Sequence, residues 1–273
     1  MNLTILDGGL SNALEDRGHD LSSSLWTARL LLDAPGEIAA VHRAYFAAGA
    51  QVATTASYQA PTELLGLSVR IAREARTADG QLVAASLGPY GAALADGSEY
   101  RGRYGVPAAT LRDFHAPRIA ALVEAGPDLL AVETVPDAEE AEVLVPLLED
   151  AGVPAWFSYS VDGDRTRAGQ PLASAYAVLA GRPGIVAAGV NCARPADVLG
   201  AVEAAVAATG LPAVAYPNRG EDWDPVAKAW VGTGGVPLDL ARSWVAAGAS
   251  YVGGCCRVGP AEIRALVEGL ADA

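Results

Sequence analysis

The chain alternates short apolar runs with segments of helical spacing along its length, and this alternation limits its fold more than any other feature. Eight runs have the length and composition of strands, and they are LTIL, QVATTAS, LVAASL, LLAVET, AWFSYS, IVAAGVN, PAVAYP and YVGG. At least one segment with helical spacing separates successive runs, and most of these segments end in a glycine that can cap a helix. Because the runs are apolar on both faces, they indicate a parallel sheet covered by helices.

The number of strand and helix units matches the length of the chain. Eight units in 273 residues take about 34 residues each, close to what a βαβ unit requires. Barrels built from eight such units commonly need roughly 250 residues. We therefore predict one α/β domain over residues 1–273, folded as a (β/α)8 TIM barrel. An open, doubly wound parallel sheet is the alternative that spacing alone leaves open.

The charge of the chain limits its partners. The net charge is -13 at pH 7 and the isoelectric point is near 4.6. Nucleic acids and anionic lipids are bound through basic patches, so this charge favours small molecules as ligands. No apolar run approaches the roughly 20 residues of a membrane span, and MNLTILDGGL lacks the basic segment of a secretory signal. We therefore expect a cytoplasmic protein.

Polar or reactive residues follow most of the predicted strands. The active site of a parallel barrel is built from residues at the carboxyl ends of its strands. These positions hold Asp7, Thr54, Thr55, Tyr58, Ser86, Glu133, Thr134, Ser158, Asn191, Cys192, Tyr216, Asn218, Cys255 and Cys256. All three cysteines of the chain are among them, on two strands that lie two apart in a closed barrel. The thiols can therefore meet at one point.

Three cysteines in this arrangement suit a metal better than a disulfide. They cannot all pair, and an ordinary disulfide between the adjacent Cys255 and Cys256 would be strained, which indicates a reducing compartment. A catalytic zinc site keeps three protein ligands and one open position. Successive side chains on a strand point to opposite faces, so these two can share a metal only if Gly253 and Gly254 end the strand in a turn. From the residues alone, zinc binding and inert buried cysteines are about equally supported.

A site with three thiolates favours thiol chemistry over hydrolysis. Three thiolates leave Zn²⁺ with a net charge of about -1, which makes it a weak Lewis acid for producing hydroxide. A substrate thiol has an unperturbed pKa of about 8.5, and a metal holds it as the reactive thiolate. A small thiol is therefore the expected substrate if the metal is present.

The carboxylates among the strand-end residues have two interpretations. Asp7 either caps the following helix or binds a ligand amine, and Gly8 and Gly9 allow a ligand close to the backbone. Glu133 ends an apolar strand and needs a cation, which an α-ammonium group would supply.

Other polar residues carry weaker signals. Tyr58, Asn191 and Asn218 could line the site or form turns. The histidines His19, His42 and His115 lie away from strand ends, which favours surface or packing roles.

Seven motifs distributed along the chain closely resemble the homocysteine S-methyltransferase family: LDGGLSNALEDRG, TTASYQA, SLGPYGAALADGSEYRGRY, AVET, GVNC, YPNRGEDWD and GGCCR. GVNC and GGCCR are the most specific, since together they supply the three zinc ligands of that family. The resemblance implies that Cys192, Cys255 and Cys256 hold Zn²⁺ and that the homocysteine sulfur takes the fourth position. No separate protein nucleophile is implied, and the methyl group passes directly to sulfur, giving methionine.

The resemblance also assigns the remaining site residues. Asp7, the backbone of Gly8 and Gly9, and Glu133 would bind the amino and carboxyl ends of homocysteine. A second set, Tyr58, Asn191 and Asn218, would line the site.

The long connection GPYGAALADGSEYRGRYGVP is a candidate lid or donor-binding loop. A second long connection, NRGEDWDPVAKAWVGTGG, carries tryptophans that could pack on the barrel rim.

The methyl donor differs between members of this family, which use S-methylmethionine, S-adenosylmethionine, betaine, or methylfolate through cobalamin. A barrel that takes the whole chain leaves no room for folate or cobalamin modules, or for the long C-terminal extension typical of the betaine enzymes. We therefore expect a sulfonium donor, with S-methylmethionine preferred over S-adenosylmethionine.

Three alternatives remain open. The first keeps methyl transfer but changes the acceptor to selenocysteine or another small thiol, or the donor to betaine. The second is a barrel that binds zinc or thiols without turnover. The third is a barrel with inert cysteines and a phosphate site at Gly253 and Gly254. The sequence does not indicate an oligomeric state.

Overall fold

The barrel consists of eight parallel strands. The computed structural model describes residues 3–21, 27–224, 229–231 and 234–272. The strands are β1 (Thr4–Ile5), β2 (Val52–Thr54), β3 (Leu82–Leu87), β4 (Leu129–Val135), β5 (Ala155–Tyr159), β8 (Ile185–Asn191), β9 (Ala213–Tyr216) and β12 (Ala249–Val252). Each coincides with one of the eight predicted runs, although β12 begins at Ala249 rather than at Tyr251.

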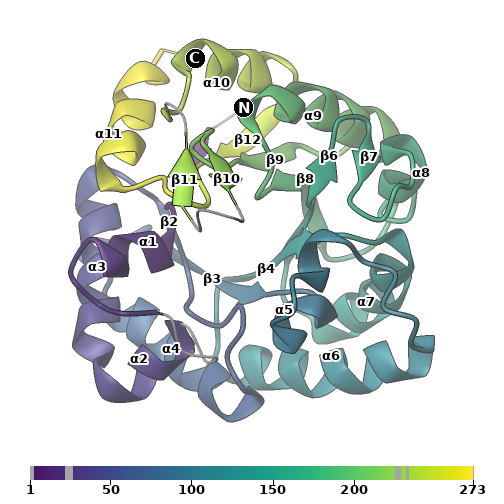
Figure 1. Ribbon diagram of the computed structural model, residues 1–273, viewed down its shortest axis with the longest axis horizontal. Helices are drawn as coiled ribbons and strands as arrows, with labels where there is room; N and C mark the ends of the chain where they lie inside the picture. Colours follow the sequence, from purple (N-terminus) through teal and green to yellow (C-terminus); the bar gives the residue numbers. More distant parts are fainter. Residues whose placement is uncertain (1–2, 22–26, 225–228, 232–233, 273) are drawn as a thin grey trace.

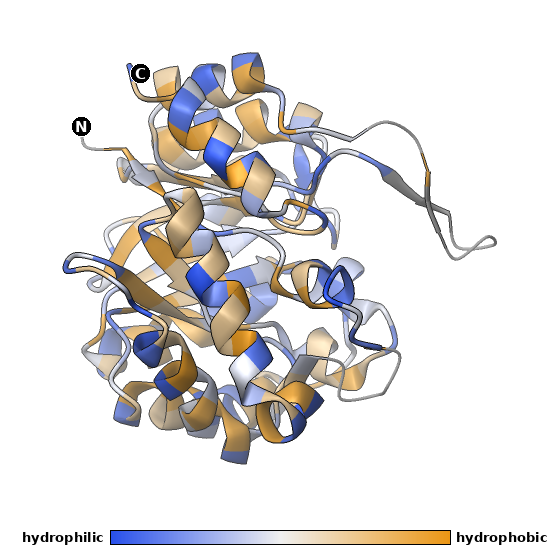
Figure 2. Cartoon of the chain, turned by 90° about the vertical axis from the view of Figure 1, so that its left-hand side faces the viewer, coloured by the Kyte–Doolittle hydropathy of each residue, from blue (hydrophilic) through white to orange (hydrophobic). Residues whose placement is uncertain are grey.

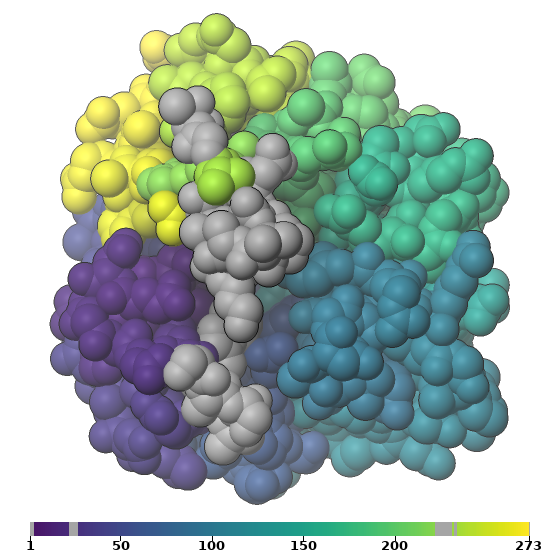
Figure 3. All heavy atoms as spheres, in the orientation of Figure 1, coloured from purple at the N-terminus to yellow at the C-terminus, as the bar shows by residue number. Residues whose placement is uncertain are grey.

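The sheet closes on itself between its first two strands. Hydrogen-bonded neighbours follow the order β1, β12, β9, β8, β5, β4, β3, β2. The Asp7 amide then donates to the Val52 carbonyl (3.0 Å), and the Gln51 amide donates to the Ile5 carbonyl (2.7 Å). The first and last parts of the chain consequently lie side by side (Figure 3). This closure confirms the TIM barrel and excludes the open sheet.

Helices surround the barrel between successive strands (Figure 1). They are α3 (Pro35–Ala48), α4 (Thr62–Glu74), α6 (Ala108–Glu124), α7 (Ala138–Ala151), α8 (Leu172–Ala177), α9 (Pro195–Thr209), α10 (Leu238–Ala246) and α11 (Pro260–Gly269). Gly49, Gly152 and Gly210 cap three of them in the left-handed conformation that the sequence predicted. Hydrophilic and hydrophobic residues alternate along the helices, as expected for elements that cover a core (Figure 2).

Side chains fill the inside of the barrel. Alternate residues of the strands form a buried cluster that includes Leu6, Val52, Trp156 and Tyr216. Trp156 is fully buried, and its indole nitrogen donates to the Tyr216 hydroxyl (2.9 Å). Because the interior is packed, a ligand has to bind at the end of the barrel.

The sequence did not predict the short elements that decorate the carboxyl ends of the strands. They are α1 (Leu10–Glu15), α2 (Thr27–Asp33), α5 (Tyr90–Leu94), the 3-10 helix η1 (Ser98–Tyr100), the antiparallel pair β6 (Val161–Asp162) with β7 (Arg165–Thr166), and the pair β10 (Asp222–Asp224) with β11 (Ala229–Val231). The last pair projects from the barrel (Figure 2). It includes two of the tryptophans expected on the rim, whose side chains lie outside the described residues.

The histidines lie where the sequence placed them, away from the strand ends. Two of them, His42 and His115, are fully buried in helices, while His19 is partly exposed and lies 3.3 Å from Glu37. Within the described ranges, the helices are too short or too polar to cross a bilayer.

Candidate metal and substrate site

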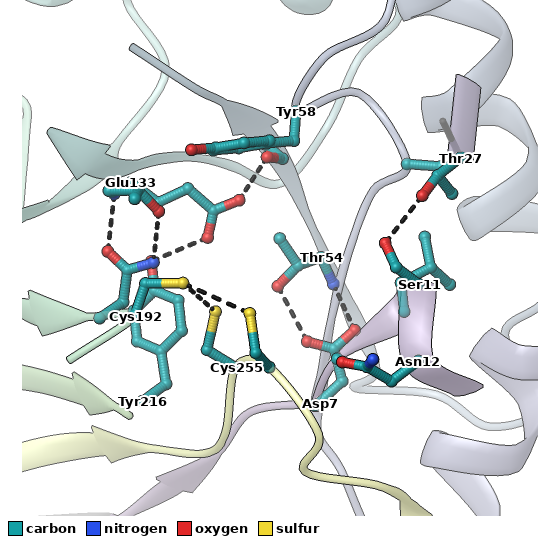
Figure 4. A pocket seen from close by; sticks show the side chains of 18 of the residues that line it. Asp7, Ser11, Asn12, Thr27, Thr54, Tyr58, Glu133, Cys192, Tyr216 and Cys255 are labelled. Carbon is teal, nitrogen blue, oxygen red and sulfur yellow. Dashed lines mark hydrogen bonds between the residues drawn. The ribbon is translucent and has the colours of Figure 1, made fainter. Parts of the chain in front are cut away.

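The structure brings the three cysteines together at the carboxyl end of the barrel, as the strand-end positions predicted. Cys192 Sγ lies 3.0 Å from Cys255 Sγ and 3.6 Å from Cys256 Sγ (Figure 4). All three sulfurs lie within 4.8 Å of one another. A tetrahedral zinc ion with Zn–S bonds of about 2.3 Å separates its sulfur ligands by roughly 3.8 Å, so the donor set fits zinc in both chemistry and spacing.

The cysteine turn after β12 depends on close backbone packing. A Cβ atom on Gly254 would lie 2.1 Å from Val258 Cγ1, and one on Gly253 would lie 2.6 Å from Leu6 Cβ. The Cys255 amide donates to the Pro217 carbonyl (2.8 Å). The strand thus ends in the turn that lets both adjacent thiols face Cys192.

Two non-glycine residues beside the site have left-handed backbone conformations. Cys192 has a φ of 50°, and Thr134 at the end of β4 has a φ of 60°. Asn191 joins these two segments, since its Oδ1 accepts from the Thr134 amide (2.7 Å) and its Nδ2 donates to Thr134 Oγ1 (2.8 Å). Such conformations are costly for side chains with a Cβ, so the surrounding bonds hold Cys192 in its orientation.

Cys192 also has an altered acidity. Hydrogen bonds from the Cys255 and Cys256 thiols hold its pKa well below the usual range for a thiol. The Tyr100 hydroxyl, carried by η1, lies 3.5 Å from Cys192 Sγ. The cluster is therefore ready to supply a thiolate ligand.

Asp7 lies at the end of β1 without a cation among the described residues. Its Oδ2 accepts from the Thr54 amide (2.8 Å) and its Oδ1 accepts from the Thr54 hydroxyl (2.9 Å). It does not cap α1, whose N-cap is Gly9 without a side-chain bond. Burial raises the pKa of Asp7 to about 8. The capping interpretation is therefore wrong, and a ligand amine remains.

Gly8 and Gly9 allow a close approach, but the approaching atoms belong to the protein. A Cβ on Gly8 would lie 2.1 Å from the Val258 carbonyl oxygen, and one on Gly9 would lie 2.6 Å from the Cys255 carbonyl oxygen. The glycines thus let the start of the chain pack against the cysteine turn. Both also line the pocket, so backbone contact with a ligand stays a prediction.

Glu133 is the second buried carboxylate of the site. It is 8% exposed, accepts from the Tyr216 hydroxyl (3.1 Å) and is hydrogen-bonded to the Ser86 hydroxyl. Burial raises its pKa to about 7. Two hydroxyl groups therefore orient Glu133, while no cationic side chain of the described residues pairs with its carboxylate.

An open pocket connects these groups, and its atom-free space, counted together with the solvent at its mouth, is about 840 Å³. It is lined by all the predicted site residues except Asn218, namely Asp7, Gly8, Gly9, Tyr58, Glu133, Asn191, Cys192, Cys255 and Cys256. Instead of lining the pocket, Asn218 accepts from the Cys256 amide through Oδ1 (3.2 Å) and so supports the cysteine turn.

Sequence reasoning missed several lining residues because they do not follow strands. Tyr100, Asn12 and Thr27 come from η1, α1 and α2. For Asn12 and Tyr100, the signal was present in LDGGLSNALEDRG and ADGSEYRGRY, which matched the family without indicating individual roles.

Comparisons with known proteins agree with this geometry. The homocysteine S-methyltransferase family model matches residues 4–270. The homocysteine S-methyltransferase of Escherichia coli K12 is 44% identical over 97% of this chain and 94% of its own length. The selenocysteine Se-methyltransferase of Brassica oleracea var. italica is 40% identical over 96% of this chain and 87% of its own length.

The fold of a solved relative is also similar. The crystal structure of the homocysteine methyltransferase MmuM from Escherichia coli, in its metallated form, superimposes with a TM-score of 0.87 at 41% identity, covering 97% of this chain and 96% of that chain. The resemblance seen in the sequence motifs is thereby confirmed. The chain belongs to the homocysteine S-methyltransferase family.

Proposed function

We propose that the protein transfers a methyl group from a sulfonium donor to the sulfur of homocysteine, forming methionine, and that Cys192, Cys255 and Cys256 hold the Zn²⁺ this requires. The observation that carries the proposal is the convergence of three thiols on a pocket that also contains two buried carboxylates, with no cationic side chain among the described residues that line it. When bound, zinc keeps a substrate thiol deprotonated and nucleophilic near neutral pH.

The buried carboxylates suit the amino-acid end of homocysteine. An uncompensated buried charge is unfavourable, and an α-ammonium group supplies the missing cation. Thr54 holds the Asp7 carboxylate in place through hydrogen bonds to both of its oxygens. Ser86 and Tyr216 orient Glu133 in the same way. These side chains would hold the substrate so that its thiol points to the cysteines, and alignment of this kind lowers a barrier by several kcal/mol.

The charge of the pocket favours a cationic donor. Among the described residues that line it, there are two carboxylates and no arginine, lysine or histidine. The rings of Tyr58 and Tyr100 border it, and aromatic faces attract cations. A sulfonium compound loses its positive charge when its methyl group departs, and this fits both S-methylmethionine and S-adenosylmethionine. The resemblance in the sequence motifs favours the first of the two.

A selenol acceptor is the second candidate function. Selenocysteine differs from homocysteine by one methylene group and by its nucleophilic atom, and a relative that is 40% identical is named for methylating it. One methylene changes binding in an apolar site by only about 1–3 kcal/mol, so the pocket need not exclude it. We also propose a reducing compartment such as the cytoplasm, because the three cysteines are free thiols.

The test is methionine formation from homocysteine, with S-methylmethionine, S-adenosylmethionine or betaine as donor and with selenocysteine as a second acceptor. We expect turnover with a sulfonium donor, its loss after zinc chelation, and its return when zinc is restored. Cys255→Ala should lose both zinc and turnover. Bound zinc without turnover for any pair of substrates would instead support a non-catalytic zinc barrel.

A further inference from the structure

The connection between β3 and α6, residues 88–107, contains α5 and η1, and its residue Tyr100 lines the pocket. Tyr100 is 43% exposed, although its hydroxyl reaches 3.5 Å from Cys192 Sγ. A surface loop of this length needs anchors to keep one side chain at such a position.

Glu140, in the first turn of α7, supplies the first anchor. It is fully buried, and its Oε1 accepts from the Tyr90 amide at 2.6 Å and lies 2.8 Å from His115 Nε2. Its Oε2 accepts from the Tyr104 hydroxyl at 3.0 Å. One carboxylate therefore binds both the start and the end of the part of the connection that contains Tyr100.

The N-cap of the same helix supplies the second anchor. Asp137 Oδ2 accepts from the Arg103 amide at 2.8 Å, while its Oδ1 caps α7 through the Glu139 amide at 3.0 Å. Gly102 packs so closely here that a Cβ atom would lie 3.0 Å from both Asp137 Cβ and Ala168 Cβ. The first turn of α7 thus holds the connection at three points.

The connection is also packed within itself. A Cβ atom on Gly91 would lie 2.5 Å from the Glu99 amide nitrogen, so α5 and η1 are in direct backbone contact. Tyr90 contacts the rings of Tyr104 and Phe114 edge to face, with centroids 5.3 Å and 5.2 Å apart. Residues 90–104 therefore form a compact unit, and loss of an anchor displaces Tyr100 together with the rest.

A buried glutamate beside a buried histidine is not the most stable way to fill this space. Apolar side chains of similar volume often stabilise a protein as well as a buried ionic pair does. The connection, however, presents a backbone amide and a hydroxyl group that both need an acceptor. Glu140 satisfies the two groups at once and thereby determines where the connection lies.

We propose that Glu140 is a positioning residue that holds residues 90–104 in place against α7, so that Tyr100 borders the space where the methyl donor binds. The effect on catalysis rests on the proposed function, whereas the effect on the connection does not. In the proposed function homocysteine binds through Asp7 and Glu133, which lie outside residues 90–104 and make no hydrogen bond with Glu140, so loss of Glu140 should alter donor binding more than homocysteine binding.

The first experiment measures how fast trypsin cleaves the connection, in the absence of any substrate. Arg101 and Arg103 are exposed trypsin sites within it. We expect Glu140→Ala to be cleaved after these residues about tenfold faster than the wild type under native conditions, because cleavage follows local opening. Mass spectrometry of the fragments gives the site and the rate. Glu139→Ala, an exposed residue of the same turn, is the matched control and should be cleaved at the wild-type rate.

The second experiment separates positioning from general damage. In Glu140→Ala we expect the KM for S-methylmethionine to rise about tenfold, while the KM for homocysteine changes less than about twofold and zinc content stays at the wild-type level. Glu140→Gln keeps an acceptor for the Tyr90 amide. It should return the cleavage rate and the KM for S-methylmethionine most of the way to their wild-type values. Equal increases in both KM values, or failure of Gln to restore them, would overturn the proposal.

A milder variant covers the case in which Glu140→Ala does not fold. Tyr104→Phe removes only the hydroxyl that donates to Glu140 Oε2, and should raise the cleavage rate about threefold, in line with one hydrogen bond of modest strength. Unchanged cleavage in this variant would overturn the part of the proposal in which Glu140 holds the end of the connection through Tyr104. If no substrate pair is turned over by the wild type, the proposed function fails, and the cleavage rates still decide whether Glu140 is the anchor.

Discussion

At the scale of single residues, the site combines soft sulfur ligands with carboxylates that carry an electrostatic cost. Burial raises the pKa of Asp7 to about 8 and that of Glu133 to about 7, and no described cationic side chain compensates for either. Perturbed acids of this kind gather where a ligand completes the site. The unfavourable burial of these two carboxylates therefore supports binding of the substrate ammonium group beside them.

This cost gives a stability that depends on pH. Burial raises the pKa of Asp7 to about 8 in the folded protein, whereas in the unfolded chain the carboxyl group has its ordinary pKa of 3.8. Between these values the folded state binds more protons, so the free energy of unfolding decreases as pH rises. We expect Asp7→Asn to remove this decrease. From pH 5 to pH 8 the wild type should lose on the order of 2–4 kcal/mol of unfolding free energy relative to the variant, which should be the more stable protein at pH 8.

Urea unfolding of both proteins at pH 5 and pH 8 checks this prediction. In a separate measurement, the KM for homocysteine should be higher for the variant, because the substrate amine loses its carboxylate partner. Parallel pH profiles for the variant and the wild type would show that Asp7 is already ionised in the folded state.

The sequence predicted those site residues that follow strands. Asp7, Glu133, Asn191 and the cysteines could be found because a parallel barrel places strand ends on one face. Tyr100 could not, since its position depends on anchors from α7 that no local pattern reveals. The sequence named Asn218, but its role in supporting the turn depends on a contact between the connections after two different strands.

At the scale of elements, β8, the strand that Cys192 follows, packs closely against β9. A Cβ atom on Gly189 would lie 1.9 Å from the Val214 carbonyl oxygen, and the Gly189 carbonyl also accepts from the Tyr176 hydroxyl (2.8 Å). The backbone cannot separate here without breaking the ladder that places Cys192. Glycine is therefore required within this strand.

We expect Gly189→Ala to lower the free energy of unfolding by more than about 3 kcal/mol and to reduce zinc binding, since the clash is with backbone. Gly200→Ala is the control. This exposed glycine in α9 has open space around it, and alanine should stabilise the helix by up to about 1 kcal/mol. Thermal unfolding of both variants measures the difference. Equal stability of the two would mean that β8 and β9 can move apart freely.

The elements also show where sequence patterns stop being informative. The eight barrel strands were predictable because each is an apolar run with turn residues on both sides. The pairs β6 with β7 and β10 with β11 contain only two or three residues per strand, which is too short for any periodicity. Their formation depends on the long connections that carry them.

At the scale of the whole molecule, the three thiols join β8 to the turn after β12, on either side of β9. A ligand that binds only the folded state stabilises it, and the gain grows with ligand concentration. We expect chelation to lower the melting temperature of the wild type by several degrees. Cys255→Ser, which cannot complete the site, should melt at one temperature with or without chelator. A wild type that is insensitive to chelation would indicate that the cysteines hold no metal.

The left-handed conformations of Cys192 and Thr134 have a consequence for how such proteins diverge. Glycine or asparagine would adopt the same backbone with less strain, so the present residues persist only while selection for the chemistry maintains them. In a duplicated copy released from that selection, replacement of either residue by Gly or Asn would relieve backbone strain at no cost to the fold. A Gly or Asn at the position of Cys192 would also remove a thiol ligand, so this one position reports both the backbone strain and the chemistry that maintains it.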